Sequence, residues 1–321
     1  MRRWIVRAVA VVVLVAAPVA LYWLADPEKQ DLDDAVRRAT PGQFVRLTDG
    51  YTHYEIAGPS TPVSSTSLRP GPHVVVLVAG FSVPYYIWDP TFKELTDAGF
   101  RVLRYDYYGR GFSDRPDIAY TDALYVRQLA ELLDSLQIAD SIDLVGLSLG
   151  GGVITSFADA FPARVRSLIY VDPSFRTPGS LPPFAGTPFL WNLIAALVAE
   201  RGWADEQLGD FLHPERFPDW PDRYRVQLQY RGFRRARLSE LVANTTVDQL
   251  EQIEQVGQHP RPVLVIWGKQ DTSVPIESSG PLLDAMPRAR LVEVEDSGHL
   301  PQWEQPAIVH NAIVEFLHQV K

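Results

Sequence analysis

The chain has 321 residues, of which 46% are hydrophobic and 21% are charged, a composition typical of a globular protein with a sizeable core. Its net charge of −9 argues against nucleic acid as the main partner. The sequence contains no Cys, which excludes a disulfide framework, a thiolate nucleophile and a thiolate zinc site.

The first 25 residues have the pattern of a membrane segment. Three arginines give residues 1–25 a charge of +3, and since the whole chain carries −9, the remainder carries −12. Residues 8–25 are 18 consecutive uncharged positions, and a helix of that length is about 27 Å long, close to the hydrocarbon thickness of a bilayer. Pro18 lies next to or within each candidate signal-peptide cleavage site and makes cleavage there unfavourable. We therefore expect a membrane anchor with the body outside the cytoplasm. Secretion after signal cleavage and a buried soluble helix are the alternatives.

Beyond a charged tether over residues 26–42, strand-like and helix-like patterns alternate along the chain. The expected strands are 43–47, 52–56, 73–78, 100–105, 141–145, 165–171, 263–267 and 290–295. The expected helices are 88–98, 121–137, 149–161, 277–286 and 305–319. Such alternation predicts an α/β fold with a mostly parallel sheet covered by helices on both faces. The alternation stops over residues 173–260, which predicts a helical cap inserted into a core of residues 43–172 and 261–321.

The most specific motif lies where a strand-like run meets a helix-like run. Gly146-Leu147-Ser148-Leu149-Gly150 has the form G-x-S-x-G, in which a sharp strand-to-helix turn projects the serine hydroxyl above the sheet. A Gly-rich phosphate loop is the competing interpretation, but no Lys-Ser/Thr pair follows the glycines. The motif therefore predicts Ser148 as a nucleophile.

A serine nucleophile needs a base, and the base needs an orienting acid. Asp271 and His299 each follow an apolar strand and occur in the order Ser, Asp, His, as expected for this type of site. Asp172, at the end of another strand, is an alternative acid, and Asp296 is expected to shape the turn before His299. The other histidines are expected to be surface or structural residues; they are His53, His73, His213, His259, His310 and His318.

These motifs together resemble the α/β-hydrolase superfamily, in its serine-nucleophile, carboxylesterase- or lipase-like branch, over roughly residues 43–320. The G-x-S-x-G segment from Gly146 to Gly150 is the nucleophile elbow of that family. The other matching segments are Ala79-Gly80-Phe81, the D-x-x-G-x-G-x-S segment from Asp106 to Ser113, Trp267-Gly268-Lys269-Gln270-Asp271, and the segment from Gly298 to Glu304. Ala79 stands where relatives usually carry His. A serine at the elbow excludes the haloalkane dehalogenase and epoxide hydrolase branches, which place Asp there.

The resemblance implies hydrolysis of a carboxylic ester, possibly lipid-like, by a Ser148–His299–Asp271 triad. The backbone N–H groups of Phe81 and Leu149 are the implied oxyanion hole. No cofactor or metal is implied. C–C bond, amide or thioester hydrolysis on the same triad is the alternative, as is a non-catalytic binding protein on this fold. Candidate substrate contacts are Ser82, Trp191 and Trp303.

Two segments of the insertion stand out. The apolar stretch 184–199 could line an acyl pocket. Residues 223–237 contain six arginines and no acid, which indicates either a solvated helix face or a basic patch for anionic headgroups or an acidic substrate.

Overall fold

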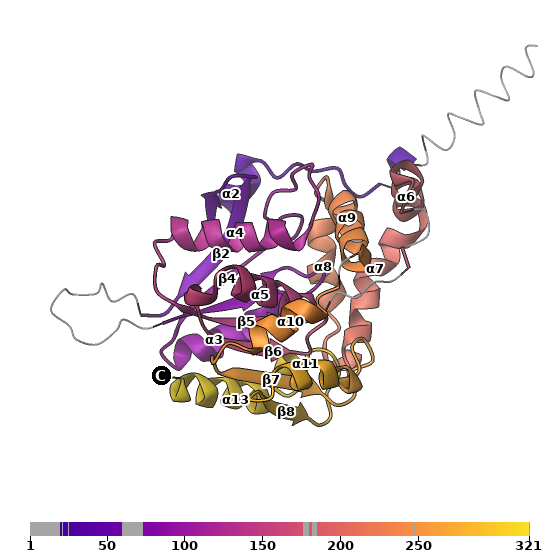
Figure 1. Ribbon diagram of the computed structural model, residues 1–321. Helices are drawn as coiled ribbons and strands as arrows, with labels where there is room; N and C mark the ends of the chain where they lie inside the picture. Colours follow the sequence, from indigo (N-terminus) through magenta and orange to yellow (C-terminus); the bar gives the residue numbers. More distant parts are fainter. Residues whose placement is uncertain are drawn as a thin grey trace, which may run out of the picture.

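A central sheet organises the protein (Figure 1). The computed structural model describes residues 20, 22–24, 26–59, 73–175, 180–181, 185–246 and 248–320. In these residues eight strands form one sheet with the order β1-β2-β4-β3-β5-β6-β7-β8. The strands are β1 Gln43–Arg46, β2 Tyr51–Ala57, β3 Val74–Val78, β4 Arg101–Tyr105, β5 Ile142–Leu147, β6 Val165–Val171, β7 Val263–Gly268 and β8 Arg290–Val294. β2 pairs antiparallel with both of its neighbours, β1 and β4, whereas β4 to β8 run parallel to β3. The predicted α/β fold is confirmed.

Strand β3 shows why the central strands have continuous apolar sequences. Val74, Val76 and Val78 pack into a cluster on one face of the sheet, whereas Val75 and Leu77 pack into a second cluster on the other face. Both faces of a parallel strand are covered, so alternation between apolar and polar residues disappears.

Helices cover the two faces. α3 Asp89–Asp97 and α13 Pro306–Gln319 pack on one face. The other face carries α4 Asp122–Ser135, α5 Leu149–Ala160, α10 Leu250–Gly257 and α11 Ser279–Ala285. Short elements connect these layers: α2 Asp34–Ala39, η1 Tyr85–Trp88, η2 Pro162–Arg164, η6 Ile276–Ser278 and α12 Pro301–Glu304.

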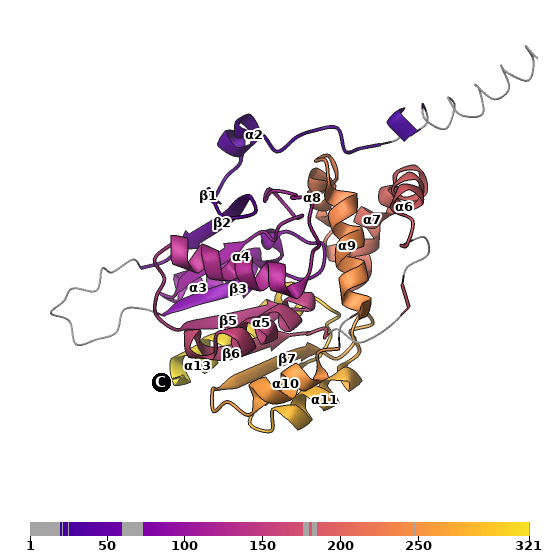
Figure 2. The ribbon, with the colours of Figure 1, turned by 45° about the horizontal axis from the view of Figure 1, so that its top comes forward.

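A group of helices from the insertion lies beside one end of the sheet (Figure 2). These cap helices are α6 Pro188–Ile194, the π-helical η3 Ala195–Ala199, α7 Glu200–Glu206, η4 Gln207–Asp210, η5 Pro214–Arg216, α8 Trp220–Leu228 and α9 Phe233–Thr246. Trp203, Trp220, Tyr224 and Phe233 are buried where the cap packs on the core. The cap thus covers the end of the sheet at which the parallel strands finish, where ligands of α/β proteins bind.

The segment after the predicted anchor packs on the cap. The N–H of Gln30 donates to the carbonyl of Gln229 at 2.9 Å, and the N–H of Arg231 donates back to the carbonyl of Gln30 at 2.9 Å. The Glu28 carboxylate accepts the N–H groups of Gly232 and Arg234, at the start of α9. Residues 26–31, expected to form part of a tether, therefore lie along the N-terminal end of α9.

The prediction of a membrane-anchored protein is corrected. Among the residues that the structure describes, no helix is both long enough and apolar enough to cross a bilayer. The apolar stretch on which the prediction rested, residues 8–25, falls almost entirely outside the described residues.

Candidate active site

Ser148 occupies a strained turn between β5 and α5. Its backbone angles, φ 51° and ψ −121°, lie in a region that residues with a side chain rarely adopt. Its N–H donates to the carbonyl of Val171 at 3.0 Å, and its carbonyl accepts the N–H of Gly151 at 2.8 Å. A Cβ at Gly146 would lie 2.5 Å from the carbonyl oxygen of Gly150, so this tight turn requires glycine.

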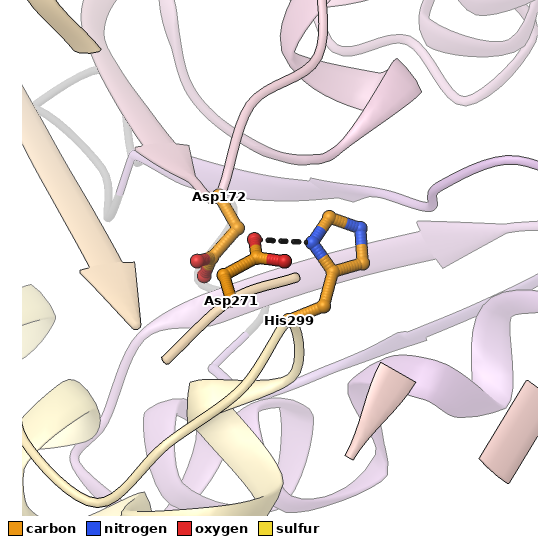
Figure 3. A group of neighbouring side chains, drawn as sticks. All are labelled: Asp172, Asp271 and His299. Carbon is orange, nitrogen blue, oxygen red and sulfur yellow. Dashed lines mark hydrogen bonds and ion pairs between the residues drawn. The ribbon is translucent and has the colours of Figure 1, made fainter. Parts of the chain in front are cut away.

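His299 and Asp271 lie in the loops that follow β8 and β7. Nδ1 of His299 lies 2.7 Å from Oδ2 of Asp271 (Figure 3). The other oxygen of Asp271 accepts the N–H groups of Ser273 and Val274 at 2.8 and 2.9 Å. These bonds fix the carboxylate, and the carboxylate in turn orients the imidazole so that Nε2 is left to act as a base.

Opposing effects act on the pKa of His299. Burial alone would lower it, but the hydrogen bond and charge of Asp271, together with the charge of Asp210, more than offset burial. The result is a pKa above the ordinary value for His. The imidazolium form is therefore stabilised at this position, as a general base that must hold a proton during the reaction requires.

A cavity of about 410 Å³ joins these groups. Ser148 and His299 both border it, although within the described residues their side chains are not hydrogen-bonded to each other; such bonds often form only when substrate is bound. Phe81 and Leu149 also border it, and in that part of the chain neither backbone N–H donates a hydrogen bond. The cavity that Ser148 borders is thus also bordered by two residues whose amides have no acceptor among the described residues.

Asp172 lies behind the pair. Figure 3 shows the Asp271 carboxylate between Asp172 and His299. Oδ1 of Asp172 accepts the N–H of Gly268 at 2.8 Å. Burial first, and then the charge of Asp271, raise the pKa of Asp172 well above its ordinary value. Burial and the neighbouring carboxylate therefore favour the protonated form of Asp172.

Asp172, Asp271 and His299 offer ligand atoms within 4.8 Å of one another. A cation at this place would have to replace the hydrogen bond between Asp271 and His299, and it would need the ionised form of Asp172, which burial disfavours. The donor set therefore suits a hydrogen-bonded chain better than a metal ion.

The three expected substrate contacts do not border this cavity. Ser82 is fully buried and its hydroxyl accepts a hydrogen bond from Tyr224 at 3.0 Å. Nε1 of Trp303 donates to the carbonyl of Ile87 at 2.7 Å, and Trp191 packs against the core cluster beneath the cap. The stretch 184–199 does not line the cavity either: Phe189 is 74% exposed and, in its described part, no residue borders the cavity.

Cap residues that the sequence did not single out take their place. Gln207, Asp210, Leu241 and Asn244 border the cavity. No sequence motif marks these four residues, because only the packing of the cap on the core brings η4 and α9 to the cavity.

The arginines of residues 223–237 make contacts with other residues of the same chain. Arg234 is buried and pairs with Asp26 and Glu200 at 2.7 and 2.6 Å. Four others pair with acids: Arg223 with Asp89, Arg225 with Asp205 and Asp222, Arg231 with Asp31, and Arg235 with Asp117. Arg237 stacks on Phe81 and Trp203. Neither a purely solvated face nor an unpaired basic patch describes this stretch.

The chain belongs to the α/β hydrolase family, whose model matches residues 75–312. It is 26% identical over 292 residues to a 2-hydroxy-6-oxononadienedioate/2-hydroxy-6-oxononatrienedioate hydrolase of Cupriavidus pinatubonensis, covering 88% of this chain and 97% of that protein. It is 30% identical over 226 residues to a 2-hydroxymuconate semialdehyde hydrolase of Pseudomonas putida, covering 68% and 76%. Among solved structures, a thermophilic esterase of Thermogutta terrifontis superposes with a TM-score of 0.72 at 25% identity, covering 87% and 99%. The chain is thus a hydrolase with the α/β-hydrolase fold.

Proposed function

We propose that the protein is a serine hydrolase that cleaves a carboxylic ester through an acyl-enzyme. The observation that carries this proposal is the convergence on one cavity of Ser148 on its strained turn, of His299 bonded to Asp271, and of Phe81 and Leu149, whose amides have no acceptor among the described residues. Each group has a defined part in acyl transfer. The likeness to a solved esterase supports the same reaction.

The reaction follows from this arrangement. The hydroxyl of Ser148 attacks the ester carbonyl while Nε2 of His299 takes its proton, and Asp271 stabilises the imidazolium that forms. The negative oxygen of the tetrahedral intermediate accepts the N–H groups of Phe81 and Leu149, and each such donor contributes about 3–4 kcal/mol. His299 then protonates the leaving alcohol, and water cleaves the acyl-enzyme by the same route.

A second candidate keeps these groups and changes the bond. Several curated relatives are named as hydrolases of 2-hydroxymuconate semialdehyde or of oxononadienedioates, and a solved structure of this fold is named a meta-cleavage product hydrolase. These names favour cleavage of a C–C bond next to a carbonyl group, and they support this candidate better than they support the ester. Attack by Ser148 would be the same, but the group that leaves would be a carbon that takes up a proton.

Both candidates are tested by assaying the full-length protein on p-nitrophenyl esters of increasing acyl length and on 2-hydroxymuconate semialdehyde, beside Ser148→Ala. We expect ester turnover in the wild type, and a loss of at least about 10³-fold in the variant. Ser278→Ala, which alters an exposed serine outside the cavity, is the matched control. Turnover of the semialdehyde alone would establish the second candidate, and undiminished turnover by Ser148→Ala would overturn both.

A further inference from the structure

A carboxylate from the cap borders the cavity next to the expected base. Asp210 ends η4, and its backbone carbonyl accepts the N–H of His299 at 2.9 Å. The cap can approach this closely because residue 298 is glycine: a Cβ there would lie 2.9 Å from the Asp210 carbonyl oxygen. Asp210 and His299 are therefore held together by main-chain packing, and both border the cavity.

The side chain of Asp210 is only partly engaged by the protein. Oδ1 accepts the Ser273 hydroxyl at 2.8 Å, whereas Oδ2 accepts no hydrogen bond from the residues that the structure describes. The pKa of Asp210 is raised: burial is the largest cause and the charge of Asp271 adds to it, while the charge of His299 and the hydrogen bond from Ser273 act in the opposite direction. The other charged group that acts on Asp210, Asp271, is already hydrogen-bonded to His299.

Asp210 lies on the side of the cavity where the leaving group of the substrate must bind. His299 must come within hydrogen-bonding distance of the leaving-group oxygen in order to protonate it. The leaving group must therefore lie on the His299 side of the cavity, where Asp210 is. A negative charge on the leaving group would meet the Asp210 carboxylate in a partly desolvated space, where repulsion is stronger than in water.

We propose that Asp210 makes the enzyme selective for the charge of the leaving alcohol: the cavity accepts esters whose leaving alcohol is neutral or cationic and discriminates against those whose leaving alcohol is anionic. This inference rests on the proposed function, whose substrate class it narrows. A dicarboxylate of the kind named for the curated relatives would be disfavoured if its leaving portion carried one of the carboxylates. Asp210 acts as a specificity residue and takes no part in bond cleavage.

The test uses three butyrate esters that form the same acyl-enzyme and differ only in the leaving alcohol. Choline is cationic, 3,3-dimethylbutanol is its neutral isostere, and 3-hydroxypropanoate is anionic. We expect wild-type kcat/KM to rank cation over neutral over anion, with about tenfold between neighbours. Asp210→Asn, which keeps the shape of the side chain and removes its charge, should bring the three values to within about threefold. The same variant should also lower the pH midpoint set by His299, because one source of its raised pKa is gone.

Asp219→Asn is the matched control, since Asp219 is an exposed acid of the same cap outside the cavity; its charge ranking should equal that of the wild type. An Asp210→Asn ranking identical to the wild type, in a folded and active protein, would overturn the inference and leave the proposed function standing. The absence of turnover on all three esters by the wild type would count against the proposed function itself.

Discussion

Two carboxylates influence the pKa of His299: Asp271, which is hydrogen-bonded to the ring, and Asp210, which borders the cavity beside it. Asp271 holds Nδ1 at 2.7 Å, and Asp210 acts through its charge; together they raise the pKa of His299 in spite of burial. A general base works only in its deprotonated form, so the raised pKa moves the onset of activity to higher pH.

The pH profile follows from that direction. With chemistry rate-limiting, kcat/KM on a neutral ester should rise with pH, with a midpoint above the ordinary His value of about 6.5. Asp271→Asn removes the largest influence that raises this pKa. It should move the midpoint to lower pH and reduce kcat by about 10³- to 10⁴-fold. Steady-state rates from about pH 5 to 9 check both; a flat wild-type profile would contradict the assignment of His299 as the base.

Asp172 offers a separate test at the residue scale. Because its pKa in the folded protein is raised, the folded state binds more protons than the unfolded state, and stability falls as pH rises through the interval between the two pKa values. Asn can accept the N–H of Gly268 and donate to Asp271, as a protonated Asp172 would. Asp172→Asn should therefore retain activity, and its stability relative to the wild type should increase with pH.

Thermal unfolding between about pH 5 and 9 measures this difference. Asp172→Ala is the contrast: it leaves the Gly268 N–H without an acceptor in a buried place, at a cost of about 1–3 kcal/mol. A large loss of activity in Asp172→Asn would instead mean that an ionised Asp172 is required for the reaction.

Strands and core helices could be predicted because each carries its own local pattern. The expected strand 165–171 coincides with β6, and the expected helix 149–161 differs from α5 by one residue at its end. The elbow could be located because a turn this tight requires glycines in the sequence itself. The positive φ of Ser148 shows that the turn is present. Ser148, Asp271 and His299 follow three such strands, so the topology of the sheet alone brings them to the same end.

The cap residues that face the cavity could not be predicted from a single sequence. The aromatic residues gave no indication of which would face the cavity: Trp191 of the cap and Trp303 of the core pack elsewhere, whereas the polar cap residues Asp210 and Asn244 border it. α9 contacts the core through a long-range interaction: Glu240 forms a buried ion pair with Arg110 and also accepts the Tyr125 hydroxyl at 2.6 Å. Because these partners are more than a hundred residues apart along the chain, no periodicity signals them.

At the scale of the whole molecule, residues 26–31 pack against the cap although they are far from it along the chain. The guanidinium of Arg234 is 3% exposed and lies among Asp26, Glu28 and Glu200. Glu28 also accepts the N–H groups of Gly232 and Arg234 at 2.8 and 2.6 Å, which are among the donors that a helix start leaves unpaired. The segment therefore stabilises the helix that carries Leu241 and Asn244 to the cavity.

Replacing one acid of this segment should destabilise the cap far more than replacing another. Glu28→Ala removes a buried partner of Arg234 and the acceptor of two N–H groups, and should cost roughly 2–4 kcal/mol. Asp31→Ala is the matched control: Asp31 and Arg231 are 69% and 54% exposed, and such pairs contribute about 0–1 kcal/mol. Thermal unfolding gives the two costs, and amide exchange of α9 should rise only in Glu28→Ala. Equal, small effects of both changes would show that α9 is held by its core contacts alone, with residues 26–31 adding nothing to the stability of the cap.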